Sequence, residues 1–527
     1  DDVESRGLGD VYKRQITNSM IRNNTSNNMS TNKGYVDTLN TQMSTQKKID
    51  RPSDDPVIAI RALRLRSSLS EINQYYEKNI PDAESWLEVT ETALKNMESI
   101  LTDVYRQCVN GATDHLNESD RNTILTNLQK LREQVYAEGN ADYAGRTVFT
   151  GYKTNKSLTF GEDTSDTSYN ITQKLEFEDI TQKTYYSGLS SVPTTDDLTA
   201  GNLPAGNVED HTYSRVRLTY DNIDNITQLQ YKDANGNLQD IEGMEITYLD
   251  ADGNTQTATV SYNVHNYTDW QNAQNLNVGD NEVIFVKETG ELILGKNVAA
   301  YMNSEKPDMV VSYDKTGFKK GEVRPEHYFD CIDTTNANPA NHITYTKEDQ
   351  EINYTIAFGQ TLAVNTQASD VFDSSIGRDI DELTDAVQMA ITAHKKVSDI
   401  ENLMKEEKYA GEEDQALLQQ WLDAAEKEAS YADDNMKNLY SEGISSFQSY
   451  LSDVVLAKTD VGSKGSRLAL TKSRMSEQQM TFKKLKSTNE DKELSDIIID
   501  YTAAYNAYQA SMQAASKAIK QTLLDYI

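Results

Sequence analysis

Cysteine, proline and long apolar runs are scarce in this sequence. Its 527 residues include two cysteines, Cys108 and Cys331, which are too few for a disulfide framework or a zinc site of paired cysteines. Mean hydropathy is -0.69, and no stretch approaches the roughly 20 consecutive apolar residues that a membrane-spanning helix needs. All 8 prolines lie between Pro52 and Pro339. The remainder of the chain therefore carries no proline that would break a helix.

Positive charge is also in deficit. The chain has 83 acidic and 51 basic residues and a formal charge of -32, and a field of that sign repels nucleic acids and anionic membrane surfaces. The deficit lies in residues 82–457, whose net charge is -37, whereas 16–81 and 458–527 each carry +3. This distribution predicts ends that pack against protein and a middle that faces water.

Residue patterns of catalysis or metal binding are missing as well. The nearest group of metal-type ligands comprises His327, Asp330, Cys331 and His342. It lacks the spacing of a zinc site, and we interpret it as a loop whose polar residues happen to be close. A run that starts like a calcium loop at Asp250 has Thr255 where such a loop needs glycine. We therefore expect no metal, no cofactor and no enzymatic activity.

Heptad stripes dominate the two ends of the chain. Apolar residues recur in steps of three and four from Ile72 to Cys108, with Pro81 either starting the helix or kinking it. A second stripe, with steps of three and four, runs through Ile498, Tyr501, Tyr505, Tyr508, Met512, Ala515, Ile519, Thr522 and Tyr526. Between about 150 and 370 the period changes to two, with turn signals such as Asn235-Gly236. We predict a mainly α fold in which the N- and C-terminal helices pair in an elongated coiled coil or bundle around inserted β-hairpins.

The segment 16–50 is rich in asparagine, which favours helix poorly. It carries only a weak stripe at Met29, Val36, Leu39 and Met43. Such a segment buries too little apolar surface to fold alone, and we expect it to be disordered in the free chain and to order on docking. We expect its partner to be the stripe that begins at Ile498.

A rigid elbow is predicted directly after this segment. It consists of Arg51, Pro52, Ser53, Asp54, Asp55 and Pro56. The prolines fix φ and disfavour helix before them, and Ser53, Asp54 or Asp55 can cap the next helix. An ordinary capped turn explains the same residues equally well.

The segment Gln46–Leu69, QKKIDRPSDDPVIAIRALRLRSSL, resembles the N-terminal signature of the flagellin superfamily, and within it the hook-associated branch. Similar stretches follow at Gln74–Leu94, at Ala144–Thr154 and from Glu493 to Ile527. Residues 1–15 match nothing in that family, and we interpret them as a non-native leader.

This resemblance implies both a domain plan and a role. The plan pairs 16–50 with 488–527 as a terminal coiled-coil assembly domain, pairs 51–155 with 376–487 as a helical bundle, and exposes 156–375 as a β-rich insert. The implied role is a structural part of the bacterial flagellum that connects hook to filament by packing of its terminal helices. The implied partners are further copies, other hook-associated protein, flagellin, an export chaperone and the flagellar secretion apparatus. The implied location is extracellular, reached without a cleaved signal peptide.

Two alternatives remain open at this point. The first is flagellin itself, which would differ in copy number and in position along the organelle. The second is a secreted adhesin or enzyme whose site lies in the β-rich insert, where convergent acids and aromatics such as Trp270 would be needed.

Overall fold

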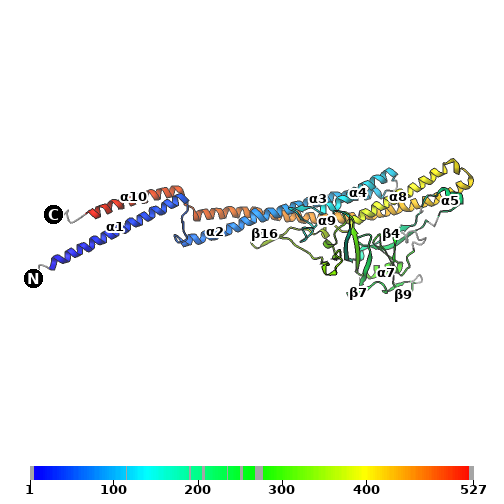
Figure 1. Cartoon of the computed structure of the whole chain (residues 1–527), viewed down its shortest axis with the longest axis horizontal. Coiled ribbons are helices and arrows are strands. Elements are labelled where there is room, and N and C mark those ends of the chain that lie inside the picture. Colours follow the sequence, from blue (N-terminus) through cyan, green and yellow to red (C-terminus); the bar gives the residue numbers. More distant parts are fainter. Residues whose placement is uncertain are drawn as a thin grey trace. The chain divides into compact units, whose positions relative to one another are not determined.

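The computed structural model describes residues 5–113, 116–188, 191–204, 208–233, 235–249, 253–267 and 277–520. The chain forms two compact units. The first comprises Asp1–Asp82, Thr355–Thr361 and Arg467–Ile527, and the second comprises Ala83–Tyr354 and Leu362–Ser466. Long terminal helices enclose a β-rich middle in the sequence, which confirms the predicted fold class (Figure 1). The predicted domain boundary near residues 50 and 488 falls inside the first unit.

Long helices form most of the described chain. In order they are α1 (Ser5–Thr45), α2 (Pro56–Gln74), α3 (Ile80–Gly111), α4 (Glu118–Gly139), α5 (Thr195–Ala200), α7 (Lys296–Glu305), α8 (Ile376–Met404), α9 (Glu412–Glu490) and α10 (Leu494–Lys520). As the absence of proline after residue 339 permits, α9 continues for 79 residues.

Pro81 lies in the first turn of α3, which begins at Ile80, as one of the two predicted alternatives placed it. A π-helical turn, Tyr75–Asn79, joins α2 to α3, and this wider turn lies just before the proline, which has no N–H for the helical ladder. The predicted stripe is buried along α3, where Leu94, Leu101 and Cys108 are inaccessible to solvent. The heptad interpretation of this region is confirmed.

Two larger antiparallel-rich sheets form the insert of the second unit. One has the order β15-β14-β3-β13-β6-β7 and the other β10-β11-β12-β5-β4, in which β10 and β11 are parallel. The strands of the first are β3 (Thr164–Leu175), β6 (Asn225–Lys232), β7 (Leu238–Asp240), β13 (Met309–Phe318), β14 (Asp330–Asp333) and β15 (Ile343–Tyr345). Those of the second are β4 (Ile180–Tyr186), β5 (Asp210–Arg217), β10 (Ser261–His265), β11 (Glu282–Val286) and β12 (Glu291–Leu294).

Three two-stranded hairpins complete the β structure that the model describes. They are β1 (Asp142–Tyr143) with β2 (Arg146–Thr147), β8 (Glu245–Leu249) with β9 (Thr255–Thr259), and β16 (Asn353–Ala357) with β17 (Gln360–Ala363). The predicted turn at Asn235-Gly236 connects β6 to β7, and Gly236 has a φ of 85° that suits glycine.

A buried ion cluster joins the five-stranded sheet to α8. Arg215 on β5 donates two hydrogen bonds of 2.7 Å to Glu382 of α8 and also bonds Glu291 of β12. Arg217 reaches Glu382 at 2.7 Å, and Lys183 of β4 lies 3.0 Å from Glu291 and 2.6 Å from Glu382. Near the end of β5 the neighbouring residues Arg215 and Val216, which point to opposite faces of the sheet, are therefore both buried, because α8 covers the face that carries the arginines.

Electrostatics inside this cluster favour the charged forms. Burial alone would raise the pKa of Glu291, but Lys183 and Arg215 outweigh burial and lower that pKa to about 2. Burial would also raise the pKa of Glu382, and the same cations hold it well below the usual range. The cluster thus stays ionised at neutral pH.

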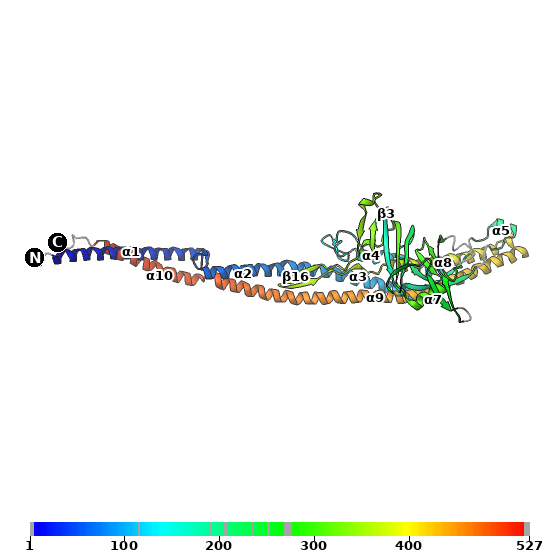
Figure 2. The ribbon, with the colours of Figure 1, turned by 90° about the horizontal axis from the view of Figure 1, so that it is seen from below.

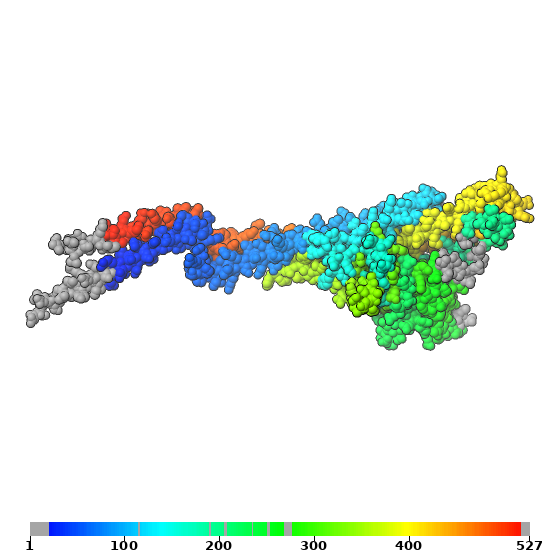
Figure 3. All heavy atoms as spheres, in the orientation of Figure 1, coloured from blue at the N-terminus to red at the C-terminus, as the bar shows by residue number. Residues whose placement is uncertain are grey.

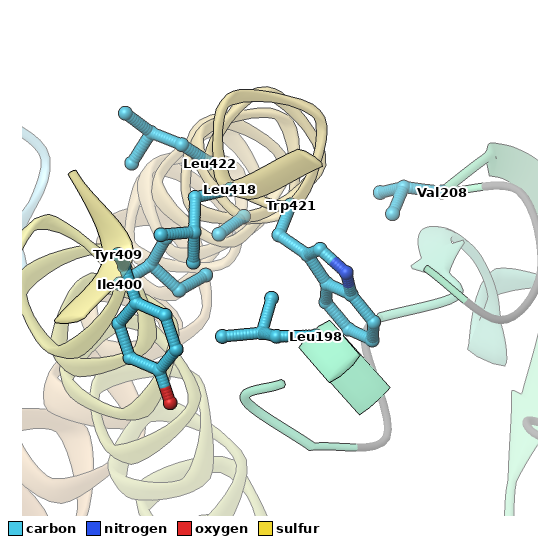
Figure 4. Close-up of a cluster of buried hydrophobic side chains, with 8 residues drawn as sticks. Leu198, Val208, Ile400, Tyr409, Leu418, Trp421 and Leu422 are labelled. Carbon is cyan, nitrogen blue, oxygen red and sulfur yellow. The ribbon is translucent and has the colours of Figure 1, made fainter. Parts of the chain in front are cut away.

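A separate apolar cluster lies where α8 and α9 meet at their connecting turn. Figure 4 shows Ile400 of α8 and Trp421 of α9 near Leu198 of α5. The indole N–H of Trp421 donates to the Asn202 carbonyl at 3.0 Å. The segment that carries α5 is thereby attached to the end of the helical hairpin.

Candidate assembly surface

The terminal helices α1 and α10 form an antiparallel pair within the first unit. They lie side by side in both ribbon views (Figures 1 and 2) and along each other in the space-filling view (Figure 3). Their core consists of Val36, Leu39 and Ala504, with the partly buried Tyr501 and Tyr508 packed against it. Three small or medium side chains are a limited core for helices of this length.

A polar contact lies in line with this core. Asn32 of α1 donates a side-chain hydrogen bond of 2.6 Å to Ser511 of α10. One residue pair of this kind between two packed helices favours a single register, because a slip takes the Asn32 amide away from its acceptor.

We call the line of contact between α1 and α10 the seam. The predicted stripe of α1 coincides with it, whereas that of α10 does so only in part. On α1, Val36 and Leu39 are buried, and Met29 and Met43 are half-buried on the same side. On α10 the seam passes through the residues Ile497, Tyr501, Ala504, Tyr508, Ser511 and Ala515. Tyr501, Tyr508 and Ala515 of the predicted stripe belong to it.

The other described members of the α10 stripe remain exposed. Ile498, Tyr505 and Met512 are 47%, 42% and 41% accessible. They recur every seven residues and lie about 80° round the helix from the seam, at about 100° per residue. The side chain of Ile519 and the whole of Tyr526 lie outside the described residues. The predicted single stripe thus combines two faces, one used within the chain and one open.

Further exposed apolar residues of the first unit lie on its other helices. On α2 they are Val57, Ile60 and Leu63, and on α1 they include Tyr35. Apolar residues spaced at helical intervals on an exposed face mark a protein interaction site.

The predicted elbow caps α2 through one of its three candidate residues. The carboxylate of Asp55 accepts hydrogen bonds from the backbone N–H groups of Val57 at 2.9 Å and Ile58 at 3.1 Å, and Pro56 occupies the first helical turn. Asp54 instead binds the N–H groups of Asp50 and Arg51, at 3.0 and 2.8 Å. The two aspartates therefore fix the elbow from both sides, while Pro52 and Ser53 form its turn.

Replacing Asp55 by alanine is expected to destabilise the first unit by about 1 kcal/mol, because two N–H groups of α2 lose their acceptor. Urea unfolding followed by helical circular dichroism measures this loss. Ser53→Ala is the matched control in the same turn and is expected to change stability by less than about 0.5 kcal/mol. Equal effects of the two changes would contradict the assignment of the cap.

A joint next to the elbow was not predicted from the sequence. Glu490, the last residue of α9, is buried and accepts two hydrogen bonds from the Arg66 guanidinium, at 2.8 and 2.7 Å. The backbone N–H of Lys48 donates to the Glu490 carbonyl at 2.7 Å, and Lys492 donates to that of Gln46 at 3.0 Å. Arg66 and Glu490 stand 424 positions apart, so no local pattern could have revealed them.

The joint should loosen in acid. Hydrogen bonds from Arg66 outweigh burial and lower the pKa of Glu490. Its stabilisation is therefore complete above the ordinary glutamate pKa of about 4.3, and it is lost as pH falls through the lower folded value. The protection of the Lys48 amide from hydrogen exchange, relative to an unstructured amide at the same pH, should fall over that range. In Glu490→Gln this amide should exchange rapidly at pH 7 already, whereas the exposed Glu493→Gln should behave as the parent chain; a protected Lys48 in Glu490→Gln would contradict the role.

The second unit contains a cleft among charged and tyrosine side chains. A hollow of about 450 Å³ lies between β4, α8 and α9, lined among others by Lys183, Tyr186 and Asp385. Among the described residues no group of three His, Cys, Asp or Glu side chains is placed to hold a metal ion. Trp270, named for the adhesin or enzyme alternative, lies outside the described residues. Within the part of the chain that the model covers, no helix is long and apolar enough to cross a membrane.

Paired terminal helices with an open apolar stripe are the kind of surface at which protein subunits pack together. Residues 16–154 match the family model of the bacterial flagellin N-terminal helical region. The resemblance to the flagellin superfamily is thereby confirmed.

Two curated proteins of the same name are similar to part of this chain. The chain is 32% identical over 117 residues to flagellar hook-associated protein 3 of Salmonella typhimurium and 31% identical over 123 residues to the protein of the same name from Escherichia coli. These matches cover 22% and 23% of this chain and 37% and 38% of the relatives. The chain thus spans less than two fifths of the length of the curated relatives that it matches.

Solved structures also match the chain, at TM-scores below 0.5. A putative flagellar hook-associated protein from Vibrio parahaemolyticus covers 83% of this chain and 100% of its own, at 13% identity and a TM-score of 0.34. Flagellar hook-associated protein 3 from Legionella pneumophila covers 80% and 98%, at 11% identity and a TM-score of 0.29.

Proposed function

We propose that this chain is a structural component of the bacterial flagellum that joins hook to filament by packing its terminal helices against neighbouring subunits. The observation that carries the proposal is the pair α1–α10, which has a small internal core and an open apolar stripe at Ile498, Tyr505 and Met512. The names of the curated relatives support the flagellar assignment.

The mechanism is association without chemistry. A neighbouring subunit covers the open stripe and so adds the apolar burial that the α1–α10 core lacks, since burial contributes roughly 25 cal/mol per Å² of apolar surface. The elbow residues Asp54 and Asp55 hold α2 at a defined entry angle while the terminal pair packs. Further copies, other hook-associated protein and flagellin are the partners that this role requires.

Export belongs to the same proposal. We infer that the chain leaves the cell unfolded through the flagellar secretion apparatus, accompanied by a chaperone that shields the open stripe of α10. The two cysteines are buried and unpaired, so refolding outside the cell does not depend on forming a disulfide between them.

Antibody labelling of intact flagella tests the location. A single band at the junction between hook and filament is expected. Labelling along the whole filament would instead favour flagellin, and absence of labelling would overturn the flagellar assignment in favour of a secreted adhesin or enzyme.

The terminal pair should be poorly protected in the free monomer. Ordering a residue costs roughly 1 to 2 kcal/mol, and the core at Val36, Leu39 and Ala504 offsets little of this cost. Hydrogen exchange on dilute protein should show fast exchange in α1 and α10 and slow exchange at Leu94 and Leu101 of α3. Strong protection of both terminal helices would contradict the expectation.

A further inference from the structure

The three largest exposed fractions among the large apolar side chains that the structure describes belong to Phe358, Leu470 and Leu456, at 87%, 75% and 70%. None of them belongs to the terminal pair α1–α10. Side chains of this size so fully in water point to a partner surface beyond the one that the terminal helices provide.

Phe358 is held in place by the structure beneath it. It occupies the tip of the β16–β17 hairpin beside Gly359, whose φ of 64° favours glycine. Asn79 donates to the Thr355 carbonyl at 2.7 Å, and Ile356 is completely buried. The aromatic ring is thus presented by a supported hairpin.

Two arginines of α9 fix the same hairpin. Arg474 donates to the Gln360 side chain at 2.6 Å and Arg467 to the Thr361 carbonyl at 3.4 Å. Leu470 follows Arg467 by three residues and precedes Arg474 by four, which places it on their side of the helix. Phe358, Arg467, Leu470 and Arg474 form what we call the basic patch.

The same spacing recurs on α9 with the opposite charge. Asp453, Leu456 and Asp460 also stand at positions i, i+3 and i+7, and all three are exposed. We call them the acidic patch. The Asp460 side chain has an i,i+4 contact of 2.8 Å with Lys464 and remains 58% accessible, so part of its carboxylate faces solvent.

The two patches have the same residue spacing and opposite charges. Each places one leucine between two ions of one sign, and the sequence distance between them is fourteen residues, or two heptads. Opposed charges around an apolar centre are the arrangement that fixes partner and register at a protein interface. Since one chain carries both patches, the partner that fits is a second copy of the same chain.

We propose that the basic patch of one copy binds the acidic patch of the next, with a stagger of two heptads between their α9 helices. Such a contact joins two different surfaces. The first copy therefore keeps a free acidic patch and the second a free basic patch, and the contact can repeat from copy to copy. This proposal rests on the proposed function, because assembled flagella supply the neighbouring copies. The contact would be a second one, in addition to the packing of the terminal helices.

Disulfide trapping tests the contact in the full chain. The variant with Leu456→Cys and Leu470→Cys should give an intermolecular ladder of dimers and larger species, in isolated flagella or in concentrated purified protein. The two cysteines cannot bond to each other within one helix at a separation of fourteen residues, and the native Cys108 and Cys331 are buried. The matched control combines Leu456→Cys with Leu249→Cys, also strongly exposed, and should give no ladder.

Charge reversal then separates a specific contact from random collision. In the Leu456→Cys, Leu470→Cys background, Arg467→Asp with Arg474→Asp should lower the cross-linked fraction about tenfold, and adding Asp453→Arg with Asp460→Arg should restore it. A missing ladder in both preparations, or reversal without restoration, would overturn the proposal. Antibody labelling at the junction of the same flagella shows independently whether the proposed function holds.

Discussion

Met512→Asp is expected to abolish incorporation of the chain into flagella while its melting temperature as a monomer stays unchanged. Met512 lies on the open stripe of α10 and is 41% accessible, so a charge there remains solvated in the free chain and costs less than about 0.5 kcal/mol. When a neighbour covers the stripe, the same carboxylate must be desolvated at a cost of several kcal/mol. Fractionation of flagella from cells that express the variant measures incorporation, and calorimetry measures the melt.

Lys517→Asp is the matched control on the same helix. Lys517 is exposed and lies on the side of α10 opposite the seam, so the variant should be incorporated like the parent chain. Normal incorporation of Met512→Asp would contradict the proposed role of the stripe. A lowered monomer melting temperature would instead assign Met512 to a core within the chain.

Arg215→Ala should destabilise the second unit by about 3 to 5 kcal/mol, because it leaves the buried carboxylates of Glu291 and Glu382 without their shared cation. Burial alone would lower the pKa of Arg215, but Glu382 and Glu291 raise it well above the ordinary value, so the guanidinium is always charged. Thermal unfolding followed at the tyrosines of the sheet measures the loss.

An exposed arginine in the same unit provides the comparison. Arg106 is 63% accessible at its side chain and pairs with Asp103 at 2.7 Å across one helical turn. Arg106→Ala should cost less than about 1 kcal/mol, as exposed pairs usually do. If both alanine variants melt alike, the buried cluster does not hold the sheet to α8.

The spacing of apolar residues alone was enough to predict α3 and the face of α1 that contacts α10. The steps of three and four from Ile72 to Cys108 admit one helical face, and Leu94 and Leu101 are buried on it. On α1 the weak stripe still located the contact, because its two middle residues, Val36 and Leu39, are the buried ones.

On α10 the spacing of apolar residues was not enough to predict which face contacts α1. Ile497, Ile498 and Ile499 are consecutive, so the spacing of large apolar residues cannot choose among three faces. The seam follows the small residues Ala504 and Ser511, which let α1 approach closely and which a search for large apolar side chains overlooks. The tyrosines at 505 and 508 then divide between the open face and the seam.

Long-range ion pairs were beyond sequence reasoning for a different reason. Glu382 meets Arg215 across 167 positions and Glu490 meets Arg66 across 424. The sequence around Glu382 and Glu490 has no pattern that predicts which arginine each carboxylate binds. Exposed and buried arginines look identical until the covering helix is known.

The joint at Glu490 has a mechanical consequence for the proposed junction. The chain passes twice through it, once on the way from α1 to α2 and once from α9 to α10, and the two strands bond each other at Lys48 and Lys492. A single strand would act as a swivel, whereas two strands tied side by side can flex about one axis but resist rotation about their length. A coupling built from such joints would transmit torque from a rotating hook while still allowing the angle between its two sides to change.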